Sequence, residues 1–589
     1  MSRIAGSAVI AFICLSLQLA ACDRTVAVSN EPRLIIEHDV AVPMRDQVVL
    51  RADIYRPDTA RPVPVLVYRT PYGKHNAARE YETHLRAVER GYAVVLQDVR
   101  GRYASGGEFN AYRNEGNDGY DTIEWAAAQP WSTGAVGTYG LSYPGAVQWL
   151  AAVQSPPHLQ AMVPAMTFSS PRNFFYMNGV FDLSWLPWIY FNIAPDARIR
   201  LGLAGATTDA EIAADWEREG DALLSFLPLA ELPILREEAP FYFEWLRHPP
   251  NDSWWDWAEI RGRYDRVGAA VLNLSGWYDE AYGPEGAVTN FNGIVASRRG
   301  SAPRAYLILG PWQHGVAETA QTRLGELDFG PRSAIDYDAV LLQFFDHYLS
   351  NKKTSLTDAA PVRYFVMGAN EWRTAASWPP PEVRTERLCL GKRAHRGFLD
   401  HCDSEPDRAQ SSFHADPAHP VTDPYGSFAA HDYRALAERE DVLVFDTPPL
   451  VDAMTIAGNV SAHMYVSCDC ADFDLWVRLL DVHPDGSAIN LMSPGADVQR
   501  LSYRNKHDAA QLLTPGDLYE VRIDGLLTAN RFDVGHRIRI QVSASFAPYL
   551  SRNLQSGETE IESSRAVPAT ITVHHNKNSP SSLVLPVIR

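Results

Sequence analysis

This sequence lacks a surplus of basic residues. Its 589 residues include 53 lysines and arginines against 71 aspartates and glutamates, which gives a formal net charge of −18 at pH 7. A protein that binds nucleic acid needs a basic face to neutralise phosphates, and no such face is visible here. We therefore expect no nucleic-acid partner. Hydrophobic residues at 46% and charged residues at 21% are ordinary values for a globular protein.

The N-terminal hydrophobic run is too short for an ordinary membrane span. It extends from Ala5 to Ala20 after Arg3, which suits the core of a signal peptide. The run ends in Leu-Ala-Ala-Cys22, which resembles the lipobox of bacterial lipoproteins. We expect removal of residues 1–21, lipidation of Cys22 and export to the periplasm or cell surface, with a lipid anchor in the membrane. Ordinary secretion with cleavage nearby is the alternative.

Cysteine is sparse, and the 6 cysteines are Cys14, Cys22, Cys389, Cys402, Cys468 and Cys470. The first two belong to the expected signal peptide and lipid site, which leaves four in an oxidising compartment. Up to two disulfides are therefore possible, and Cys389 with Cys402 is the first choice because their loop is short. No histidine-rich ligand spacing accompanies Cys468 and Cys470, so we expect no metal site there.

The chemistry of the sequence centres on residues 137–146, Gly-Thr-Tyr-Gly-Leu-Ser-Tyr-Pro-Gly-Ala. An apolar run precedes this stretch and a helix-compatible segment follows it. The pattern is typical of a nucleophile elbow, in which a strand ends, a serine takes a strained turn and a helix begins. Ser142 is therefore the candidate nucleophile. Pro144 replaces the small residue usual two positions after the serine, but proline is tolerated in a first helical turn.

Short apolar runs on both sides of the elbow predict parallel strands that helices bury on both faces. These runs are Pro64–Tyr68, Tyr92–Gln97, Val271–Gly276 and Ala305–Gly310. Helix-compatible segments lie between them, and an antiparallel hairpin of Leu34–Val42 and Val48–Tyr55 precedes them. This succession predicts an α/β fold with a doubly wound sheet.

Two polar residues follow the later strands of this predicted sheet. Asp279 comes after Val271–Gly276, and His314 comes after Ala305–Gly310. Active-site groups on parallel sheets lie just beyond the carboxyl ends of strands, and Ser142, Asp279, His314 is the chain order that α/β-hydrolases use. An imidazole titrates near neutral pH, so His314 would act as the base and Asp279 would hold its other ring nitrogen. His347 is a rival, but it lies in a helical apolar pattern where a surface histidine is expected.

Two further regions have residue patterns that differ from that of the predicted parallel sheet. Aromatic residues and helix-like runs from about Phe168 to Ile260 predict a helical cap over the site. From Pro361 onward the chain alternates with period two, as in Val362–Val366, which predicts a C-terminal all-β jelly-roll sandwich of the galactose-binding-like type. The span 403–434 is expected to be a long surface loop. The predicted order is signal peptide 1–21, tether 22–33, hydrolase 34–167, cap 168–261, hydrolase 262–355 and sandwich 361–589.

Five ordered motifs carry a family resemblance. They are Arg-Thr-Pro-Tyr at 69–72, Asp-Val-Arg-Gly-Arg at 98–102, Gly-Leu-Ser-Tyr-Pro-Gly at 140–145, Gly-Trp-Tyr-Asp at 276–279 and Gly-Pro-Trp-Gln-His at 310–314. Together they resemble the cocaine esterase-like (CocE/NonD) serine hydrolases, relatives of X-prolyl dipeptidyl peptidases and α-amino-acid ester hydrolases. The likeness continues through Asp-Val-His-Pro-Asp-Gly at 481–486 and Ala-Asn-Arg-Phe at 529–532.

The resemblance implies a two-part oxyanion hole. The Tyr72 hydroxyl would be one donor, and the backbone N–H of Tyr143, which follows the nucleophile, would be the other. Within the cap, Trp254 and Trp255 are candidates to line an acyl pocket, with aromatic packing as the alternative. Asp252 or Asp256 is a candidate to face a substrate ammonium group, which would need buried carboxylates to replace its hydration.

The sequence therefore predicts a serine hydrolase that cleaves small-molecule esters or amides through an acyl-enzyme, with no metal or organic cofactor. The first alternative keeps the chemistry but takes α-amino-acid esters or X-Pro peptides as substrates. The second alternative is an inert surface lipoprotein whose sandwich binds carbohydrate. An intact set of Ser142, Asp279 and His314 speaks against the second alternative.

Overall fold

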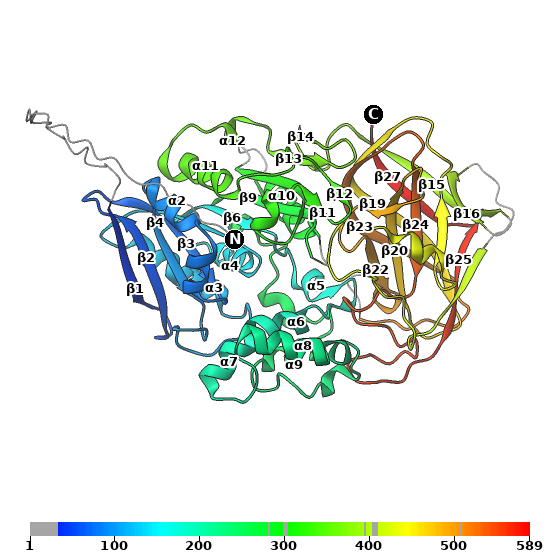
Figure 1. Ribbon diagram of the computed structural model, residues 1–589, viewed down its shortest axis with the longest axis horizontal. Helices are drawn as coiled ribbons and strands as arrows, with labels where there is room; N and C mark the ends of the chain where they lie inside the picture. Colours follow the sequence, from blue (N-terminus) through cyan, green and yellow to red (C-terminus); the bar gives the residue numbers. More distant parts are fainter. Residues whose placement is uncertain (1–32, 281–282, 299–303, 394–395, 403–409, 506–508) are drawn as a thin grey trace, which may run out of the picture.

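The computed structural model describes residues 33–589 except 281–282, 299–303, 394–395, 403–409 and 506–508. The expected signal peptide, the expected lipid site Cys22 and nearly all of the expected tether lie outside the described residues. Within the described part of the chain, none of the helices combines the length and the apolar character that crossing a membrane requires. The chain forms an α/β part, a helical cap and a β-rich C-terminal part, which lie against one another (Figure 1).

The α/β part is built on a 10-stranded sheet whose central strands are parallel. The antiparallel hairpin β1–β2 forms one edge, and the antiparallel strand β14 forms the other. In spatial order the strands are β1 (Leu34–Pro43), β2 (Val49–Pro57), β4 (Ala93–Asp98), β3 (Val63–Thr70), β5 (Ser132–Leu141), β6 (Leu159–Ala165), β9 (Ala270–Tyr278), β10 (Ala305–Gln313), β13 (Val362–Val366) and β14 (Glu371–Ala375).

Helices cover both faces of this sheet, which explains the continuous apolar runs of its strands. One face carries α3 (Glu115–Ala127), α4 (Tyr143–Ala152) and α10 (Glu285–Ser297). The other carries α1 (Lys74–Glu80), α2 (Thr83–Glu89) and α11 (Tyr337–Ser350). The expected α/β-hydrolase arrangement is confirmed.

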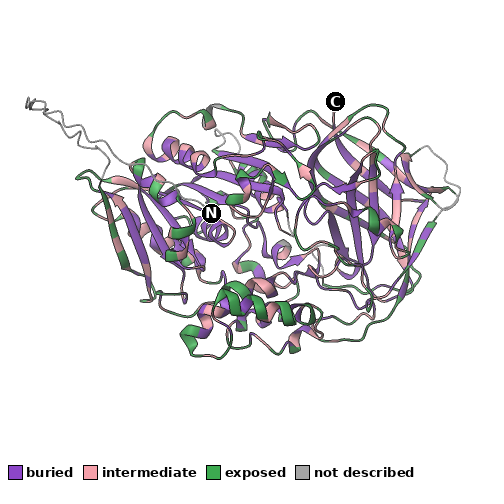
Figure 2. Ribbon diagram, in the orientation of Figure 1, coloured by how far each residue is buried: buried purple, intermediate pink, exposed green. Residues whose placement is uncertain are grey.

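The cap lies between β6 and β9 in the chain. Its helical segments are α5 (Pro171–Phe174), α6 (Trp185–Trp188), the π-helix η1 (Ile189–Ile193), α7 (Ala194–Leu201), α8 (Asp209–Leu224), η2 (Leu229–Glu231), α9 (Pro240–Arg247), η3 (Ser253–Trp257) and η4 (Tyr264–Arg266). Thr208 and Glu211 form a capping box that starts α8. In Figure 2 the outer faces of α7 and α8 are exposed, whereas the central strands of both large sheets are mostly buried.

The C-terminal part is a 13-stranded sheet that folds over on itself as a sandwich. Its strands are β15 (Val383–Arg393), β16 (Arg396–His401), β17 (Gln410–Ala415), β18 (Leu443–Asp446), β19 (Met454–Cys468), β20 (Asp474–Val482), β21 (Ala488–Asn490), β22 (Ala496–Arg500), β23 (Tyr519–Phe532), β24 (Arg537–Ser543), β25 (Ala569–Asn576), β26 (Ser579–Pro580) and β27 (Ser582–Ile588). The predicted all-β C-terminal domain is confirmed.

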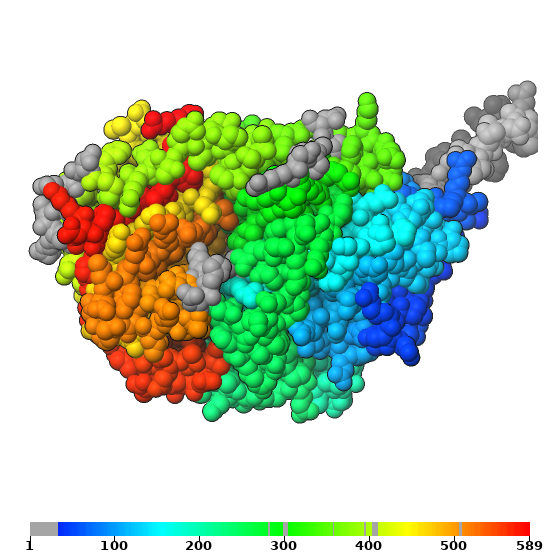
Figure 3. Space-filling view, turned by 180° about the vertical axis from the view of Figure 1, so that it is seen from behind, coloured from blue at the N-terminus to red at the C-terminus, as the bar shows by residue number. Residues whose placement is uncertain are grey.

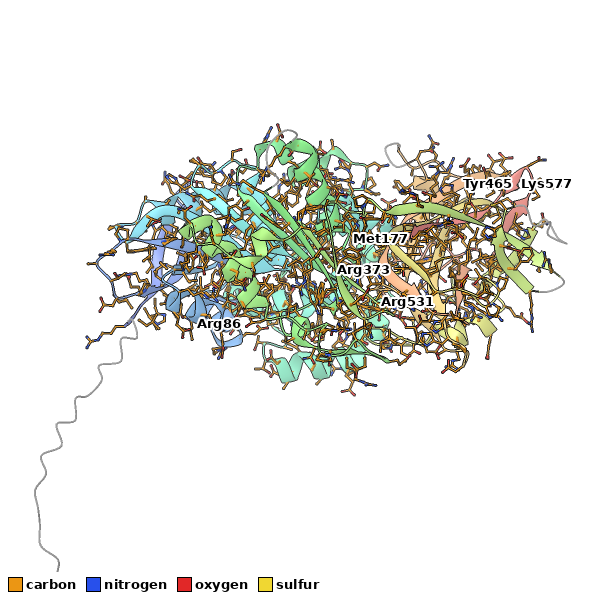
Figure 4. All side chains as sticks on the ribbon, turned by 90° about the horizontal axis from the view of Figure 1, so that it is seen from above. Arg86, Met177, Arg373, Tyr465, Arg531 and Lys577 are labelled. Atoms are coloured by element: carbon orange, nitrogen blue, oxygen red, sulfur yellow. A yellow bond between two sulfur atoms is a disulfide. The ribbon has the colours of Figure 1, made fainter. Side chains whose placement is uncertain are left out.

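The three parts share one buried apolar cluster that extends from the hydrolase sheet through the cap into the sandwich. In Figure 3 the orange strands of the sandwich lie directly against the green second half of the hydrolase part. Met367, just after β13, exchanges backbone hydrogen bonds with Ala529 and Arg531 of β23 at 3.0 and 2.8 Å. Arg373 and Arg531 accordingly lie near the junction of the two parts in Figure 4.

The predicted start of the sandwich at residue 361 is wrong. Residues 362–366 do alternate, but β13 pairs in parallel with β10 and belongs to the hydrolase sheet. Strand β14 then closes that sheet, and the sandwich begins at β15. Period two identifies a strand without indicating which of two neighbouring sheets it joins.

The predicted surface loop 403–434 is also partly wrong. Strand β17 lies within it and pairs with β25, and its residues 420–428 reach the hydrolase active-site region described below. The expected disulfide between Cys389 and Cys402 is confirmed, and it links the paired strand β15 to the end of β16. Cys468 and Cys470 form the second disulfide.

Candidate active site

Ser142 is the single residue between the end of β5 and the start of α4. Its backbone has φ 68° and ψ −127°, a conformation that L-residues rarely adopt and that costs conformational energy. Its carbonyl accepts the N–H groups of Gly145 and Ala146 at 2.8 and 2.9 Å, so the helix starts at once. Its own N–H donates to the Ala165 carbonyl of β6 at 3.1 Å. These contacts hold the turn, and the serine side chain reaches the cavity described below.

Two glycines create the room that the elbow needs. Gly140 has φ 140°, and a Cβ there would lie 2.4 Å from the Cβ of Pro144. A Cβ on Gly145 would lie 2.6 Å from the carbonyl oxygen of Ala165. Pro144 occupies the first turn of α4, where its missing N–H would be unpaired in any case. The departure seen in the sequence is therefore accommodated by the glycines around it.

Asp279 and His314 meet at the carboxyl ends of the neighbouring strands β9 and β10. The carboxylate Oδ1 lies 2.5 Å from the imidazole Nδ1, and Asp279 is fully buried. The other carboxylate oxygen, Oδ2, accepts the Ser275 hydroxyl at 2.6 Å. These two bonds fix the orientation of the carboxylate and, through it, the imidazole ring. His347, the rival from the sequence, lies in the last turn of α11 instead.

The electrostatics of this pair favour the protonated imidazole. Burial alone would lower the pKa of His314, but the negative charges of Asp279 and Glu280 outweigh it and raise the pKa to about 9. Glu280 directly follows Asp279 and lines the same cavity as Ser142 and His314. Burial raises the pKa of Glu280 above its ordinary value, while the charge of His314 opposes that rise.

Tyr72 lies beside the elbow, in the loop between β3 and α1. Its hydroxyl accepts the indole N–H of Trp188 at 3.0 Å and is also hydrogen-bonded to the Ser142 side chain. Burial raises the pKa of Tyr72 to about 12, although both hydrogen bonds oppose this, so the phenol stays protonated at neutral pH. Because the indole occupies a lone pair, the phenolic proton points to another acceptor. The cap, through Trp188, therefore helps to aim this hydroxyl.

A buried arginine holds the Tyr72 loop in place. Arg102 is 1% exposed and donates to the Pro71 carbonyl at 2.8 Å. It also donates to the carbonyls of Asn192 and Ile193 in η1, both at 2.7 Å. The same side chain thus ties the loop before α1 to the cap. The motif at 98–102, whose role the sequence left open, positions Tyr72.

Tyr143, the first residue of α4, is anchored by its side chain. The phenol donates to Glu115 at 2.9 Å and accepts the N–H of Tyr112 at 2.8 Å. Glu115 is in turn paired with Arg69 at 2.8 Å. The N–H of Tyr143 is in the first turn of α4, where backbone donors have no partner within the helix. That donor is therefore available to a substrate oxygen next to Ser142.

A cavity of about 1080 Å³ opens over Ser142 and His314, with walls from all three parts of the chain. The cap contributes aromatic side chains, which are Phe174, Trp185, Trp188, Phe191, Trp216 and Phe226. The sandwich contributes two loops, 420–428 and 547–552. Acidic side chains also line the cavity, and they are Asp182, Asp221, Glu280, Asp423 and Glu560. A cavity of this size and mixed lining is typical of a small-molecule site.

Comparison with known proteins decides the family. Residues 46–316 match the X-Pro dipeptidyl-peptidase (S15) family, and residues 354–584 match the X-Pro dipeptidyl-peptidase C-terminal non-catalytic domain. The chain is 33% identical to cocaine esterase of Rhodococcus sp. (strain MB1 Bresler), over 94% of this chain and 99% of that esterase. The chain belongs to the cocaine esterase-like serine hydrolases.

Solved structures share the fold of this cocaine esterase-like hydrolase over nearly its whole length. An α-amino-acid ester hydrolase matches with a TM-score of 0.78 and 24% identity, covering 96% of this chain and 99% of that chain. An aminopeptidase from a marine sediment archaeon matches with a TM-score of 0.78 and 24% identity, covering 95% and 97%. A CocE/NonD hydrolase from Staphylococcus aureus matches with a TM-score of 0.67 and 20% identity, covering 94% of each chain.

The three cap residues predicted to lie at the substrate pocket, Trp254, Trp255 and Asp252, do not line the cavity, which corrects that prediction. Trp255 is fully buried and packs against Phe175, with ring centroids 4.9 Å apart. Trp254 stacks on His248, with ring centroids 4.3 Å apart. Asp252 caps η3 and accepts a hydrogen bond from His248 at 2.8 Å. Packing within the cap, the alternative considered for the tryptophans, explains their positions.

Sequence reasoning missed three contributors to the cavity. Trp188 is one of many cap aromatics, and nothing in the sequence marks it as the partner of Tyr72. The sandwich loops were missed because residues 420–428 belong to a span predicted to be a surface loop. Glu280 had a signal, since it is the residue next to the candidate acid Asp279.

The raised pKa of His314 predicts an alkaline pH profile for this hydrolase. The imidazole must be neutral to accept a proton, so kcat/KM for an uncharged ester should rise with pH until about 9. In Glu280→Gln one of the negative charges that raise this pKa is gone, so the rising limb should move to lower pH. Profiles of kcat/KM for wild type and variant test this. A rising limb that stays at the same pH in the variant, or moves to higher pH, would show that Glu280 does not raise the pKa of His314.

Proposed function

We propose that this chain is a serine esterase that forms an acyl-enzyme on Ser142. In the first step the Ser142 oxygen attacks the substrate carbonyl while His314 accepts the hydroxyl proton. The C–O bond to the leaving alcohol then breaks, and the imidazolium returns the proton to that alcohol. Water, deprotonated by His314, attacks the acyl-enzyme in the second step, and the acid is released with Ser142 restored. Asp279 stabilises the imidazolium in both steps.

The proposed oxyanion hole combines the Tyr72 hydroxyl with the Tyr143 N–H. Both donors flank Ser142, and a protonated phenol donates to a developing negative charge more strongly than to a neutral carbonyl. No step of this mechanism requires a metal or an organic cofactor. The aromatic cap side of the cavity would hold an apolar acyl or alcohol group.

One observation carries this proposal. A serine in a strained turn shares one cavity with an imidazole whose other nitrogen is bonded to a fully buried carboxylate. A fluorophosphonate probe should label the wild-type protein on the peptide that contains Ser142. A p-nitrophenyl ester should release a burst of p-nitrophenol equal in concentration to the enzyme as the acyl-enzyme forms. A protein that stays unlabelled even at alkaline pH, where His314 is neutral, would favour the inert carbohydrate-binding alternative.

A second candidate function is hydrolysis of α-amino-acid esters or X-Pro peptides. The observation that favours it is the acidic lining near the base. Glu280 is partly buried beside His314, and burial raises the pKa of the neighbouring Asp182 to about 7 despite its bonds to Ser184. A substrate ammonium would compensate such buried carboxylates.

Substrates that differ only in the amino group separate the two candidates. If Glu280 receives an ammonium, the ratio of kcat/KM for an α-amino p-nitrophenyl ester over its deamino analogue should fall about tenfold or more in Glu280→Gln. Both esters are compared on one enzyme at one pH, below the pKa of the substrate amine, so that the amine is protonated and the shift in His314 cancels from each ratio. A ratio below one in the wild type, together with no hydrolysis of X-Pro anilides, would leave the plain esterase as the function.

Export and lipidation remain a proposal from the sequence. The signal-peptide pattern and Cys22 support a lipoprotein anchored outside the cytosol.

A further inference from the structure

A cluster of possible metal ligands lies at the β1 edge of the hydrolase sheet, away from the proposed catalytic groups. It consists of His38 on β1, Asp53 on β2 and His75 on α1, and one ligand atom from each lies within 4.8 Å of the others. Both imidazoles approach the same carboxylate oxygen. The Nδ1 of His38 lies 2.9 Å from Asp53 Oδ2, and the Nδ1 of His75 lies 3.2 Å from it.

An irregularity in the β1–β2 hairpin creates this arrangement. The register passes from Glu37 opposite Ile54 to Val40 opposite Ala52, so two residues of β1, His38 and Asp39, stand against Asp53 alone. Asp39 takes a φ of 52° there. Such bulges redirect side chains, and here the bulge brings His38 to Asp53.

The second oxygen of Asp53 is held by the protein. Oδ1 accepts the N–H of Asp39 at 3.0 Å and lies 3.6 Å from the ammonium of Lys74. Lys74 is buried, and its ammonium also lies 2.8 Å from Asp39 and 3.4 Å from Asp98. Carboxylates that bind metals are oriented by such outer contacts, which leave the other oxygen free to coordinate.

The charged side chains around Asp53 carry a net negative charge. Asp39, Asp53 and Asp98 lie around the ammonium of Lys74, and the Arg51 guanidinium donates to the Asp39 backbone carbonyl at 3.1 Å, so three carboxylates face two cationic side chains. A cation at Oδ2 of Asp53 would offset the remaining negative charge. Lys74 lies on the Oδ1 side of Asp53 and 3.4 Å from the Nε2 of His75, whereas the Nδ1 atoms of both imidazoles face Oδ2.

We propose that His38, Asp53 and His75 bind a divalent transition metal of the zinc class, with water completing the coordination. Donor atoms around a tetrahedral zinc, each about 2.0–2.2 Å from the metal, lie about 3.3 Å from one another. The two separations of 2.9 and 3.2 Å are close to this value. The imidazoles, whose side chains are 59% and 61% exposed, adjust without disturbing the core.

The metal would cross-link two elements of the fold. It joins the edge strand β1 to α1, which begins two residues after Tyr72. Edge strands have few partners, so a cross-link there raises the stability of the fold. The site has no role in the proposed acyl transfer.

A second cluster of Asp481, His483 and His536 provides an internal control. Its ligand atoms also lie within 4.8 Å of one another, but its two histidines approach different carboxylate oxygens, at 2.8 Å for His536 and 3.9 Å for His483. Asn530 donates to the oxygen nearer His483 at 3.3 Å, so that oxygen already has a partner. We expect His483→Ala to leave metal binding unchanged.

The experiment is a titration of the metal-stripped full chain with Zn²⁺ by calorimetry and with Co²⁺ by visible absorption. Wild type and His483→Ala should bind one ion and show the intense ligand-field bands of four-coordinate Co²⁺, and Zn²⁺ should raise Tm in both. Affinity should fall about 10- to 100-fold in His38→Ala and in His75→Ala. His38→Gln retains a hydrogen-bond donor to Asp53 and should show the same loss of affinity, which separates coordination from folding.

Equal affinity in wild type and His38→Gln would overturn the proposal, as would loss of binding in His483→Ala alone. Failure of the wild-type chain to bind Zn²⁺ stoichiometrically would also overturn it. These outcomes are independent of esterase activity, which is expected to be the same with and without Zn²⁺.

Discussion

Replacing Ser142 with alanine is expected to lower kcat by about 10⁶-fold, because the variant has no nucleophile to form the acyl-enzyme. His314→Ala should cost about as much, since a serine hydroxyl without a base within reach is a weak nucleophile. The two residues act as one unit if the proposal is right. The double variant should therefore be no slower than either single variant.

Steady-state kinetics with a p-nitrophenyl ester measure this effect, and a Tm equal to that of the wild type separates it from loss of folding. His347→Ala is the matched control, because this histidine lies on α11 and should retain full kcat. Effects of Ser142→Ala and His314→Ala that multiply in the double variant would contradict a shared proton-transfer unit.

Replacing Tyr72 with phenylalanine is expected to lower kcat by about 10²–10³-fold, which corresponds to ~3–4 kcal/mol. The change removes one hydroxyl, which bonds to Trp188 and to the Ser142 side chain. A donor that acts mainly on the oxyanion affects kcat more than KM, because its bond strengthens as the negative charge develops. A Tyr72→Phe enzyme with nearly full kcat would exclude this hydroxyl from the oxyanion hole.

Trp188→Phe tests how the cap contributes to the same donor. The indole N–H bonds the Tyr72 oxygen at 3.0 Å, so its loss should cost one neutral hydrogen bond and lower kcat about 2- to 10-fold. In the Tyr72→Phe background the same change should have little further effect, because the acceptor is already absent. Independent effects in the two backgrounds would show that Trp188 acts by filling the cavity instead.

The carboxylates near His314 link substrate choice to pH. Glu280 raises the pKa of the base and lines the same cavity, so one side chain affects both the pH profile and the reception of a substrate amine. The sandwich supports this segment, because the Ser493 N–H donates to the Trp277 carbonyl at 3.0 Å and its hydroxyl donates to the Glu280 carbonyl. The C-terminal part therefore contributes to the active-site region as well as to stability.

Much of the architecture could be predicted from local patterns. The apolar runs that became β3, β4, β9 and β10 predicted strands covered on both faces, and the elbow predicted the turn at Ser142. The positions of Asp279 and His314 just after two such strands predicted that they would meet, and the structure places them 2.5 Å apart. Strand ends on one parallel sheet converge whatever the details of packing.

Other features depend on which distant segments approach one another. Alternation at 362–366 indicated a strand but not its sheet, and the aromatic cluster at 254–257 indicated burial but not what it packs against. Trp188 meets Tyr72 only because Arg102 ties η1 to the loop after β3. His38 meets Asp53 only because β1 has a bulge.

The sequence by itself determined the α/β-hydrolase fold, the elbow and the order of its candidate catalytic residues, because these follow from periodicity and turn chemistry within short segments. The tertiary structure alone decided the walls of the cavity, the charges around His314, the partner of Tyr72 and the histidine cluster at the sheet edge. Each of these is a contact between side chains far apart in the chain, and their distances depend on how whole elements pack.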